Sequence, residues 1–451
     1  MKRRLLKILT LLVFSISASA QCWQSLAAGS WHTMGLRPDG SLWGWGSGVY
    51  GQIGSGASAG GSTIMYRVGV DTDWVFVDAR EFRTFGIKNN GTLWAWGQNN
   101  YSVLGDGTIS ERHVPTRIGL DTNWASVSTG LSYTLGIKTD GTIWGWGRTD
   151  NHELGIGILT TQTNPVRIGN ANDWSSIAAG GSSSFGIKTN GTLWGWGSNY
   201  LGVLGLGDEN IRMYPVQIGT STWSTVSAGY SHTMAIKSDG TLWCWGNNHW
   251  GEIGDGTDIR RTAPVQIGTD TNWSMVSAGD EFSFALKSDG TMWTWGKNGN
   301  QQSGDGTYAT YRTPHKATEE AGFVTINSGS GHLTAVRNNG DGYAWGRNNY
   351  GQSAYDPLIN SPFVGVIPCA VTLETESFEK SKLTIYPNPT SGMIYSSVEF
   401  ETATVVTSDG KIIEVTNMTN YADVSALSAG IYILKIIDKE GKMHSTKFVK
   451  Q

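Results

Sequence analysis

The sequence predicts an all-β protein, a seven-bladed β-propeller followed by a small C-terminal β-sandwich, and three observations support this fold class. A motif with two tryptophans returns along the chain at intervals of 49 to 51 residues. Asp-Gly or Asn-Gly, which favour tight hairpin turns, stands at the same turn in all seven repeat units. All 21 tryptophans lie at or before Trp345, and a segment of different composition follows. A period of this length indicates repeated supersecondary units.

The first twenty residues have the pattern of a signal peptide. Lys2, Arg3 and Arg4 precede a short apolar stretch over residues 5–16, and small residues at 18–20 predict cleavage before Gln21. Cys22 raises a lipoprotein alternative, which Gln21 disfavours because a small residue is expected there. No later stretch reaches 18 uninterrupted apolar residues, so we expect no transmembrane segment.

Composition excludes several classes of protein. The 451 residues carry a net charge of -4, which argues against a nucleic-acid partner because such proteins normally present a basic field. Three cysteines are too few for a disulfide framework or a multi-cysteine zinc module. A hydrophobic content of 39% is too high for a disordered chain.

Each repeat unit has the same order of features. The unit opens on an aromatic residue, continues through a short alternating strand and a hairpin, and closes with a glycine-rich loop and a proline-led strand. The opening aromatics are Trp23, Trp74, Trp124, Trp174, Trp223, Trp273 and Phe323. The tryptophan motif inside the hairpin begins at Trp43, Trp94, Trp144, Trp194, Trp243, Trp293 and, in altered form, Tyr343. About four strands in about 50 residues is the content of one propeller blade, so we expect residues 21–371 to form seven blades.

The residues of the fifth unit identify a family. Ala228 to Lys237, followed by Asp239-Gly240-Thr241-Leu242-Trp243 and Gly251-Glu252-Ile253-Gly254, resemble the regulator-of-chromosome-condensation repeat. The resemblance returns seven times across residues 23–371 and implies a propeller with a central channel. The family's namesake exchanges nucleotide on a nuclear GTPase and touches chromatin. We do not expect that function in an exported acidic protein.

Two cysteines lie where the first and last blades must meet. Cys22 directly precedes the first opening tryptophan, and Cys369 occupies the adjacent place in the repeat register after the seventh unit. Because an exported protein meets an oxidising compartment, we predict a Cys22–Cys369 disulfide, with two unrelated thiols as the alternative. Cys244, between two tryptophans, is expected to be an inert buried thiol.

The segment after residue 372 has its own organisation. Residues 372–381 are rich in Glu, Ser and Thr and predict a linker. Residues 382–451 show alternating strands and turns typical of a small sandwich. This segment resembles the C-terminal sorting domain of the type IX secretion system of Bacteroidetes. The matching residues are Tyr386, Pro387, Asn388, Pro389, Gly410, Lys411, Gly430, Ile431, Tyr432, Lys447, Phe448, Val449 and Lys450. The resemblance implies that residues 382–451 engage the secretion machinery and direct the protein through the periplasm and across the outer membrane, to be secreted or held at the cell surface. An ordinary binding module is the alternative.

Catalytic and metal-binding patterns are weak. His32, His232 and His332 share one repeat position, which favours a structural role over a metal site, and we expect neither metal nor cofactor. Glu153 and Glu252 share another position and are interpreted as polar turn residues, although two channel-facing carboxylates could serve acid–base chemistry. Each blade also has a cation before its hairpin glycine, interpreted as a solvated position rather than an anion-binding ring. These cations are Arg37, Lys88, Lys138, Lys188, Lys237, Lys287 and Arg337.

The loops that differ between blades are the candidate binding surface, because repeat proteins bind through such loops. The candidate face aromatics are Trp31, Phe82, Tyr133, Tyr230, Phe282 and Trp250, and Tyr50, Tyr101 and Tyr350 stand beside them in the second loop set. Aromatic residues there suit a sugar or a protein anchor. The leading hypothesis is therefore a non-enzymatic binding propeller for a protein or glycan. Two alternatives stay open: a secreted hydrolase or lyase with its site at the channel mouth, and a surface-layer or adhesion component.

Overall fold

A computed structural model describes residues 22–451 apart from residues 59, 355–360, 368–384, 398, 408–411, 416, 419 and 440–442. The predicted signal peptide, the predicted linker and Cys369 therefore lie outside the described residues. The chain divides into two compact units, residues 1–370 and residues 371–451. Each unit is described by itself.

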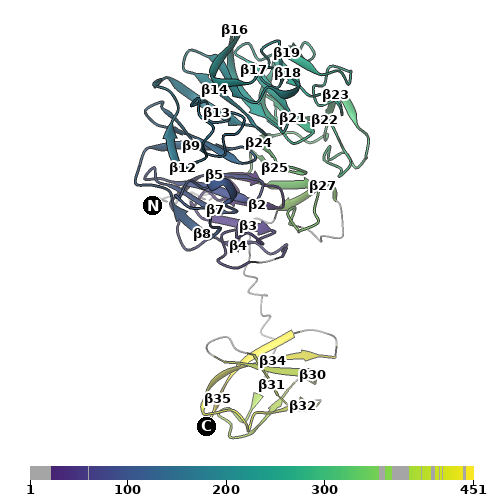
Figure 1. The fold of residues 1–451 in the computed structure, drawn as a ribbon. Helices are drawn as coiled ribbons and strands as arrows, with labels where there is room; N and C mark the ends of the chain where they lie inside the picture. The colour runs from purple at the N-terminus through teal and green to yellow at the C-terminus, as the bar shows by residue number, and fades with distance from the viewer. Residues whose placement is uncertain are drawn as a thin grey trace, which may run out of the picture. The chain divides into compact units, whose positions relative to one another are not determined.

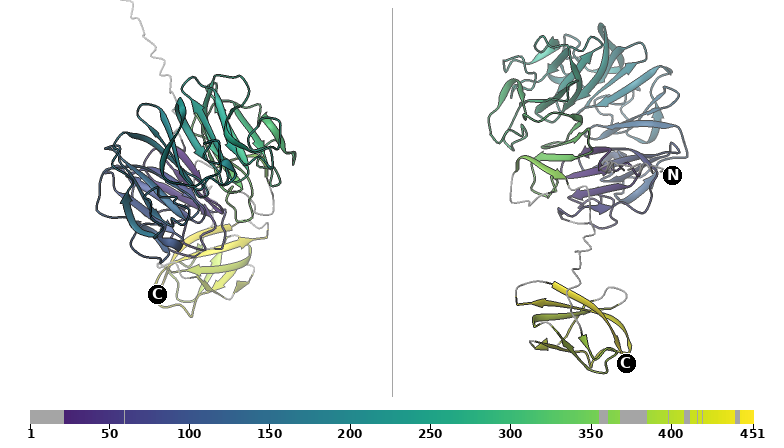
Figure 2. Two further views of the ribbon diagram at one scale, coloured as in Figure 1. Left: turned by 45° about the horizontal axis from the view of Figure 1, so that its top comes forward. Right: turned by 180° about the vertical axis from the view of Figure 1, so that it is seen from behind.

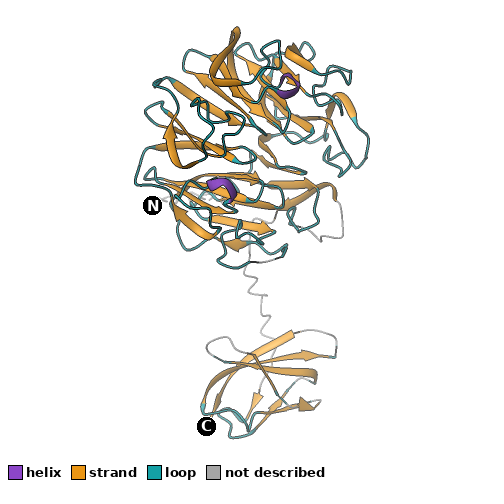
Figure 3. Ribbon diagram, in the orientation of Figure 1, coloured by secondary structure: helices purple, strands orange, loops and turns teal. Residues whose placement is uncertain are grey.

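The first unit is a β-propeller. Its described residues form five separate four-stranded antiparallel sheets and one seven-stranded sheet that comprises two blades, which makes seven blades in all (Figures 1 and 3). The predicted all-β propeller is thus confirmed. The two blades of the larger sheet share one long strand, β16 (Arg212–Ala228), which is the outer strand of blade four and continues as the inner strand of blade five.

The strands of the blades follow chain order. Blade one contains β1 (Ser25–Ala28), β2 (His32–Leu36), β3 (Leu42–Gly46) and β4 (Tyr66–Arg67). Blade two contains β5 (Trp74–Arg80), β6 (Arg83–Lys88), β7 (Leu93–Gly97) and β8 (Arg112–Arg117). Blade three contains β9 (Trp124–Thr129), β10 (Tyr133–Lys138), β11 (Ile143–Gly147) and β12 (Gln162–Arg167). Blade four contains β13 (Trp174–Ala179), β14 (Ser183–Lys188), β15 (Thr192–Gly197) and the first part of β16. Blade five continues from β16 with β17 (His232–Lys237), β18 (Leu242–Gly246) and β19 (Arg261–Gln266). Blade six contains β20 (Trp273–Ala278), β21 (Phe282–Lys287), β22 (Met292–Gly296) and β23 (Tyr311–Lys316). Blade seven contains β24 (Phe323–Ser328), β25 (His332–Arg337), β26 (Gly342–Gly346) and β27 (Ser361–Ile367). Two short 3-10 helices, η1 (Asn100–Ser102) and η2 (Tyr200–Gly202), lie in loops of blades two and four (Figure 3).

The inner strands of neighbouring blades are joined through side chains. The Ser128 Oγ accepts from the backbone N–H of Ala179 at 2.9 Å, and Ser227 does the same for Ala278 at 3.0 Å. At the junction of blades seven and one, the Asn327 Oδ1 accepts from the Ala28 N–H at 2.7 Å. Figure 2 shows the green strands of blade seven beside the purple strands of blade one, so the ring is closed.

The tryptophan motif fastens each blade to the blade before it. Its second tryptophan is fully buried in the interblade core. The Trp146 Nε1 donates to the Val103 carbonyl at 2.8 Å, and the Trp45 Nε1 donates to the Gln352 carbonyl at 3.0 Å across the closure. Six of the seven second tryptophans combine apolar burial with such a hydrogen bond, whereas the Trp96 Nε1 has no hydrogen-bond partner among the described residues, so apolar burial is what the motif provides in every unit.

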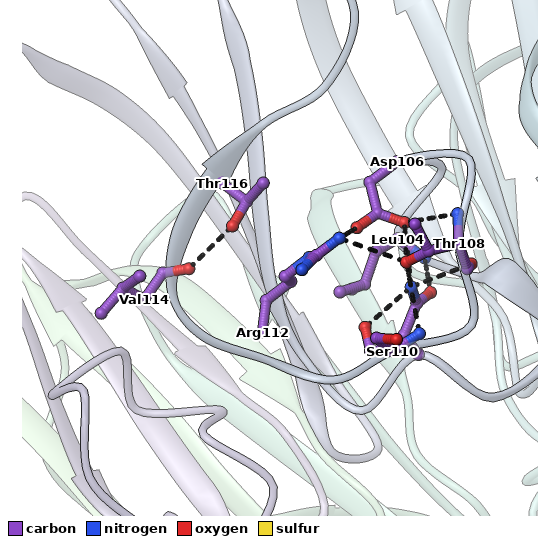
Figure 4. A network of polar contacts seen from close by, with 8 residues as sticks. Leu104, Asp106, Thr108, Ser110, Arg112, Val114 and Thr116 are labelled. Atoms are coloured by element: carbon purple, nitrogen blue, oxygen red, sulfur yellow. Dashed lines mark hydrogen bonds and ion pairs between the residues drawn. The ribbon is translucent and has the colours of Figure 1, made fainter.

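The loop after each motif is held by its own polar side chains. In blade two, the Asp106 carboxylate accepts from the Thr108 N–H and hydroxyl and pairs with Arg112 at 2.6 Å (Figure 4). The buried Asn99 amide donates to the Asp106 carboxylate at 3.0 Å and accepts from the Leu104 N–H at 2.9 Å. These acidic loop residues are therefore architectural.

The second unit is a small β-sandwich of two antiparallel sheets. The order of one sheet is β28 (Ile385–Tyr386), β29 (Met393–Ser396), β33 (Tyr421–Asp423) and β32 (Asn417–Met418), and that of the other is β31 (Ile412–Glu414), β30 (Phe400–Val406), β34 (Gly430–Asp438) and β35 (Met443–Lys450). Its core contains Ile394 and Ala422 from the first sheet and Val405, Leu434 and Phe448 from the second.

Candidate functional site

The two variable loop sets open on the same face of the propeller. In blade one, β1 ends at Ala28 and β2 begins at His32, which pairs with Gly46, the last residue of β3. The loop between the first two strands and the loop after the third strand therefore emerge together. We call the surface formed by these two loops in all blades the loop face.

Four half-buried aromatic side chains gather on the loop face where blades seven, one and two meet. Trp31 stacks on Tyr350 with ring centroids 4.6 Å apart and meets the edge of Phe82 at 4.5 Å. Tyr50 lies 5.2 Å from Phe82. We call Trp31, Tyr50, Phe82 and Tyr350 the closure cluster. The structure thus brings together members of both predicted loop sets.

Two predicted face aromatics are instead buried between blades, so their assignment to the binding face was wrong. Tyr133 and Phe282 are each 1% exposed. Tyr133 donates to the Ser183 carbonyl at 2.6 Å in the next blade. Both residues occupy the repeat position of His32, whose side chain fills the space between blades. Their aromatic character beside a variable loop predicted exposure, whereas their place in the repeat register is a buried one.

The three repeat histidines are structural, as expected from their shared position. The His32 Nε2 lies 2.9 Å from the Thr84 hydroxyl, which donates to the Gln52 carbonyl at 2.8 Å. Because that hydroxyl uses its proton on the carbonyl, it accepts from the Nε2–H of a neutral histidine. Burial lowers the pKa of His32, His232 and His332 to about 3, which keeps them neutral.

Trp250 and Tyr230 also lie on the loop face, but on blade five, whereas the closure cluster lies on blades seven, one and two. The half-buried Trp250 donates through Nε1 to the Glu281 carboxylate at 3.3 Å, and Lys297 lies over its ring while pairing with Glu281. Tyr230 is 52% exposed and lines a depression with Tyr200, which is 71% exposed. Tyr200 was not predicted, because it stands three residues after the glycine of its Trp-x-Trp-Gly motif, whereas the aromatic residues of the predicted loop set stand four residues after theirs.

The central channel contains an arginine where the other blades have glycine. Arg80 replaces the residue that is Gly29, Gly130, Gly180, Gly229, Gly279 or Gly329 elsewhere. Its Nη1 donates to the Ala228 carbonyl of blade five at 3.2 Å, so the side chain crosses the channel. The channel wall encloses about 200 Å³ and is mainly polar, with serines and Asn327 on the inner strands.

Carboxylic acids cluster near Arg80 at the channel mouth. Glu81, in a left-handed conformation with φ of 50°, accepts from the hydroxyls of Ser30 at 3.0 Å and Ser330 at 3.2 Å. Asp280 also hydrogen-bonds Ser330, and burial raises its pKa to about 7. Burial likewise raises the pKa of Asp78 to about 6, against the opposing charge of Arg80. The sequence signal for this cluster was the departure of blade two from the repeat glycine.

The repeat cations neither form an anion ring nor stand free in solvent. Lys138 lies 3.6 Å from the centroid of Trp144 and 4.8 Å from that of Trp124, and it pairs with Asp121 at 2.8 Å. The same stacking recurs at Arg37, Lys88, Lys188, Lys237 and Lys287. Their positive charges are therefore used within each blade.

Glu153 and Glu252 are also structural. The Glu153 carboxylate accepts from the backbone and side-chain amides of Asn151 at 2.9 and 3.0 Å. The Glu252 carboxylate accepts from the Trp250 N–H at 2.7 Å and the Asn247 amide at 2.8 Å. Within the part of the chain that is described, no group of three or more His, Cys, Asp or Glu side chains is arranged to hold a metal ion.

The cysteines divide as their sequence contexts suggest. Cys22 is disulfide-bonded, whereas Cys244 is a buried free thiol whose pKa is raised by burial. The predicted partner of Cys22, Cys369, lies outside the described residues, so the pairing stays a prediction. Among the described residues, no helix has the length and apolar character needed to cross a membrane.

The predicted sorting motif contributes to the architecture of the second unit. Pro387 and Pro389 lack N–H groups, and the Asn388 side chain between them accepts from the Val449 N–H at 2.9 Å and donates to the Lys447 carbonyl at 3.2 Å. Tyr432, next to Gly430 and Ile431, packs on Phe448 in the core with ring centroids 5.5 Å apart. Tyr386 and the Lys447 side chain are exposed. The motif thus closes the edge of the last strand and leaves Tyr386 on the surface.

Family comparisons agree with both units. The regulator of chromosome condensation (RCC1) repeat matches residues 90–137, 140–187, 190–236 and 239–286, and a second form of this repeat matches residues 23–52, 174–203, 223–251 and 276–302. The secretion system C-terminal sorting domain matches residues 384–451.

Individual relatives share the repeat only in part. The ultraviolet-B receptor UVR8 of Arabidopsis thaliana is 31% identical over 107 residues, which is 23% of this chain and 24% of the receptor. The human E3 ubiquitin-protein ligase HERC2 is 31% identical over 85 residues, which is 18% of this chain and 2% of the ligase. The chain therefore spans a quarter or less of the length of these relatives.

Solved structures show the same fold. Human WBSCR16 has a TM-score of 0.64 at 20% identity, covering 70% of this chain and 86% of its own. Yeast RCC1 (Prp20), in a structure bound to Kap60, has a TM-score of 0.62 at 19% identity, covering 68% of this chain and 78% of its own.

Proposed function

Because the chain belongs to the regulator of chromosome condensation (RCC1) repeat family and carries a secretion-system sorting domain, we propose that it is an exported, non-enzymatic binding propeller whose loop face takes a protein or a glycan. The sorting domain indicates export through the type IX secretion system. A binding role outside the cell suits a propeller whose variable loops share one face.

The closure cluster is the observation that carries this proposal. Its four rings are half-buried and come from three blades, and the three ring pairs are respectively edge to face, stacked and tilted. Aromatic side chains with few rotatable bonds are the residues that dominate binding energy at interfaces. The cluster adjoins Glu81, because Phe82 follows that residue directly, which gives the surface an acidic border.

The test uses the purified mature chain on a glycan array and in a pull-down from the organism's extracellular medium. We expect a glycan or one protein partner to bind and its affinity to fall at least tenfold in Trp31→Ala. Tyr308→Ala, which removes an exposed aromatic side chain from blade six outside the closure cluster, is a control for the general loss of an aromatic ring. A folded protein that retains nothing in either assay would contradict a binding function.

A second candidate is an enzyme at the channel mouth. The specific observation in its favour is that Glu81 and Asp280 both hydrogen-bond Ser330, and that Asp280 with a pKa of about 7 suits a general acid. Against it, Ser330 occupies the place between the two carboxyl groups, where a scissile bond would have to lie. If the protein turns over polysaccharides or peptides in a substrate screen, Asp280→Asn would abolish the turnover under this candidate and leave ligand binding intact.

A further inference from the structure

We infer that the depression between Tyr200 and Tyr230, which we call the tyrosine pocket, binds one uncharged sugar unit of a glycan. The inference rests on the proposed binding function of the loop face and names the ligand class for a second area of it. The tyrosine pocket lies on blades three to five and has a volume of about 140 Å³.

The pocket exists because blade four has four consecutive small residues at the turn into β14. Gly180, Gly181, Ser182 and Ser183 stand where the other blades carry at least one large side chain. At the position of Ser183 the others have His32, Arg83, Tyr133, His232, Phe282 and His332, all of them buried. Ser183 is the smallest side chain in this set, so blade four leaves space that the other blades fill.

The walls of the pocket are two exposed tyrosines held by ordered loops. Tyr200 begins η2, and the preceding Asn199 accepts from the Leu204 N–H at 2.8 Å and donates to the Asp208 carbonyl at 2.8 Å. The Tyr230 N–H donates to the Gly279 carbonyl at 3.3 Å. A pyranose ring presents C–H groups on its faces, which pack on tyrosine rings, and a tyrosine hydroxyl remains available for hydrogen bonds.

The remaining lining is rich in hydroxyl groups. Ser182, Ser183, Ser198 and Ser231 line the pocket together with the apolar Val203. Ser183 is 1% exposed, and its hydroxyl has no hydrogen-bond partner in the protein. That hydroxyl is enclosed by the protein, so the hydroxyls that a ligand can reach are those of the half-buried Ser182, Ser198 and Ser231, which can both donate to and accept from sugar hydroxyl groups.

Size and charge define the ligand further. None of the residues that line the tyrosine pocket is charged, so an anionic or cationic group would lose its hydration without gaining an ion pair. A cavity of about 150 Å³ holds one benzene ring, so the pocket accepts one six-membered ring rather than several. A single neutral pyranose, at the end or the branch of a glycan, fits these conditions.

The experiment uses the full mature chain and the methyl glycosides of glucose, galactose, mannose and N-acetylglucosamine. Saturation-transfer NMR detects binding, and titration calorimetry with the best neutral oligosaccharide from a glycan array measures affinity. We expect Tyr200→Ala and Tyr230→Ala each to weaken binding at least tenfold. Ser182→Tyr, which places a large aromatic side chain in the hollow, is expected to abolish it. Tyr308→Ala removes from blade six a tyrosine whose exposed fraction lies between those of Tyr200 and Tyr230, and it is expected to leave binding unchanged.

The outcomes separate this inference from the proposed function. Thermal melting first establishes that each variant is folded. Absence of binding to every neutral glycoside and glycan by the folded wild-type chain overturns the inference, and so does binding that survives Tyr200→Ala and Ser182→Tyr. A neutral glycan that is lost in Trp31→Ala but kept in the pocket variants overturns the inference while preserving the proposed binding function.

Discussion

His32, His232 and His332 each lie fully buried between two blades, where burial lowers their pKa to about 3. An unfolded histidine has a pKa near 6.5, so as the pH falls below that value the unfolded chain takes up protons before the folded chain does. The stability that these neutral histidines contribute is therefore present above about pH 6.5 and lost as the pH falls toward 3.

A single substitution measures this effect. In His232→Gln, which can still donate to Ser283, we expect the free energy of unfolding to fall less between pH 7 and pH 4 than in the wild type. Urea denaturation at both pH values measures it. His249→Gln changes an exposed histidine and serves as the control. An unchanged pH dependence in His232→Gln would remove the assignment of acid sensitivity to these buried side chains.

Asp78 and Asp280 affect the pH dependence of the free energy of unfolding in the opposite direction to the histidines. Their pKa values are raised, so the stability linked to their protonation is present at low pH and lost as the pH rises through about 6 to 7. The sequence did not predict this cluster. In the sequence, Glu81 and Asp280 are ordinary loop residues and Asp78 lies on the strand β5, and only the closed ring places blade two opposite blades five and six.

The relay from a histidine through a hydroxyl to a carbonyl joins whole blades. Thr84→Val keeps the shape of the side chain but leaves the His32 Nε2–H and the Gln52 carbonyl without their partner. We expect a loss of about 2–3 kcal/mol in the free energy of unfolding, because both groups stay buried. Denaturant titration gives the value.

The matched control lies in the same blade. Thr116 is a half-buried threonine on β8 whose hydroxyl donates locally to the Val114 carbonyl (Figure 4). Thr116→Val is expected to change stability by less than about 0.5 kcal/mol. Equal losses in the two variants would mean that the interblade relay contributes nothing beyond an ordinary threonine.

The elements could be predicted where the same residue type recurs at the same position of every repeat unit. Asp39-Gly40 and its six counterparts placed the hairpins, and Trp45 and its counterparts placed the interblade core. Tyr133 was misplaced because an aromatic residue beside a loop has the same sequence appearance whether it faces solvent or the next blade. The tyrosine pocket was not predicted either, since a hollow depends on what four neighbouring side chains leave empty.

At the scale of the molecule, the ring must hold its two ends together without a shared strand. The described strands of blade one all come from the N-terminal end of the propeller and those of blade seven from its C-terminal end. Among the described residues, closure therefore depends on side-chain hydrogen bonds such as that from the Ala28 N–H to Asn327 and on buried tryptophans such as Trp45, which donates to the Gln352 carbonyl.

The predicted Cys22–Cys369 pairing can be measured directly. Reduction, or Cys22→Ser, should lower the free energy of unfolding by about 6 kcal/mol in the chain-entropy account, less any strain. Mass spectrometry after alkylation, with and without reductant, identifies the paired residues. Reductant should have no further effect on Cys22→Ser. Alkylation of both Cys22 and Cys369 without reductant would contradict the pairing.

The two-unit organisation predicts separable folding and export. A chain that lacks residues 373–451 should keep the melting temperature of the propeller and fail to cross the outer membrane, because its sorting domain is gone. Fractionation of cells and medium measures the location of the truncated chain. Its normal appearance in the medium would contradict the role of residues 382–451 in sorting.

The continuous strand β16 has a consequence for recognition. Tyr200 follows β15 and Tyr230 follows β16, and these strands belong to one hydrogen-bonded sheet. The two tyrosine side chains are thus held by one continuous sheet. Side chains carried by separate sheets would change their spacing whenever neighbouring blades move relative to each other. A ligand between them does not have to immobilise its receptor, so a greater share of each contact is realised as affinity. Interrupting the strand β16, for instance with Thr220→Pro, should speed the dissociation of the ligand from the tyrosine pocket even though no contacting atom is removed.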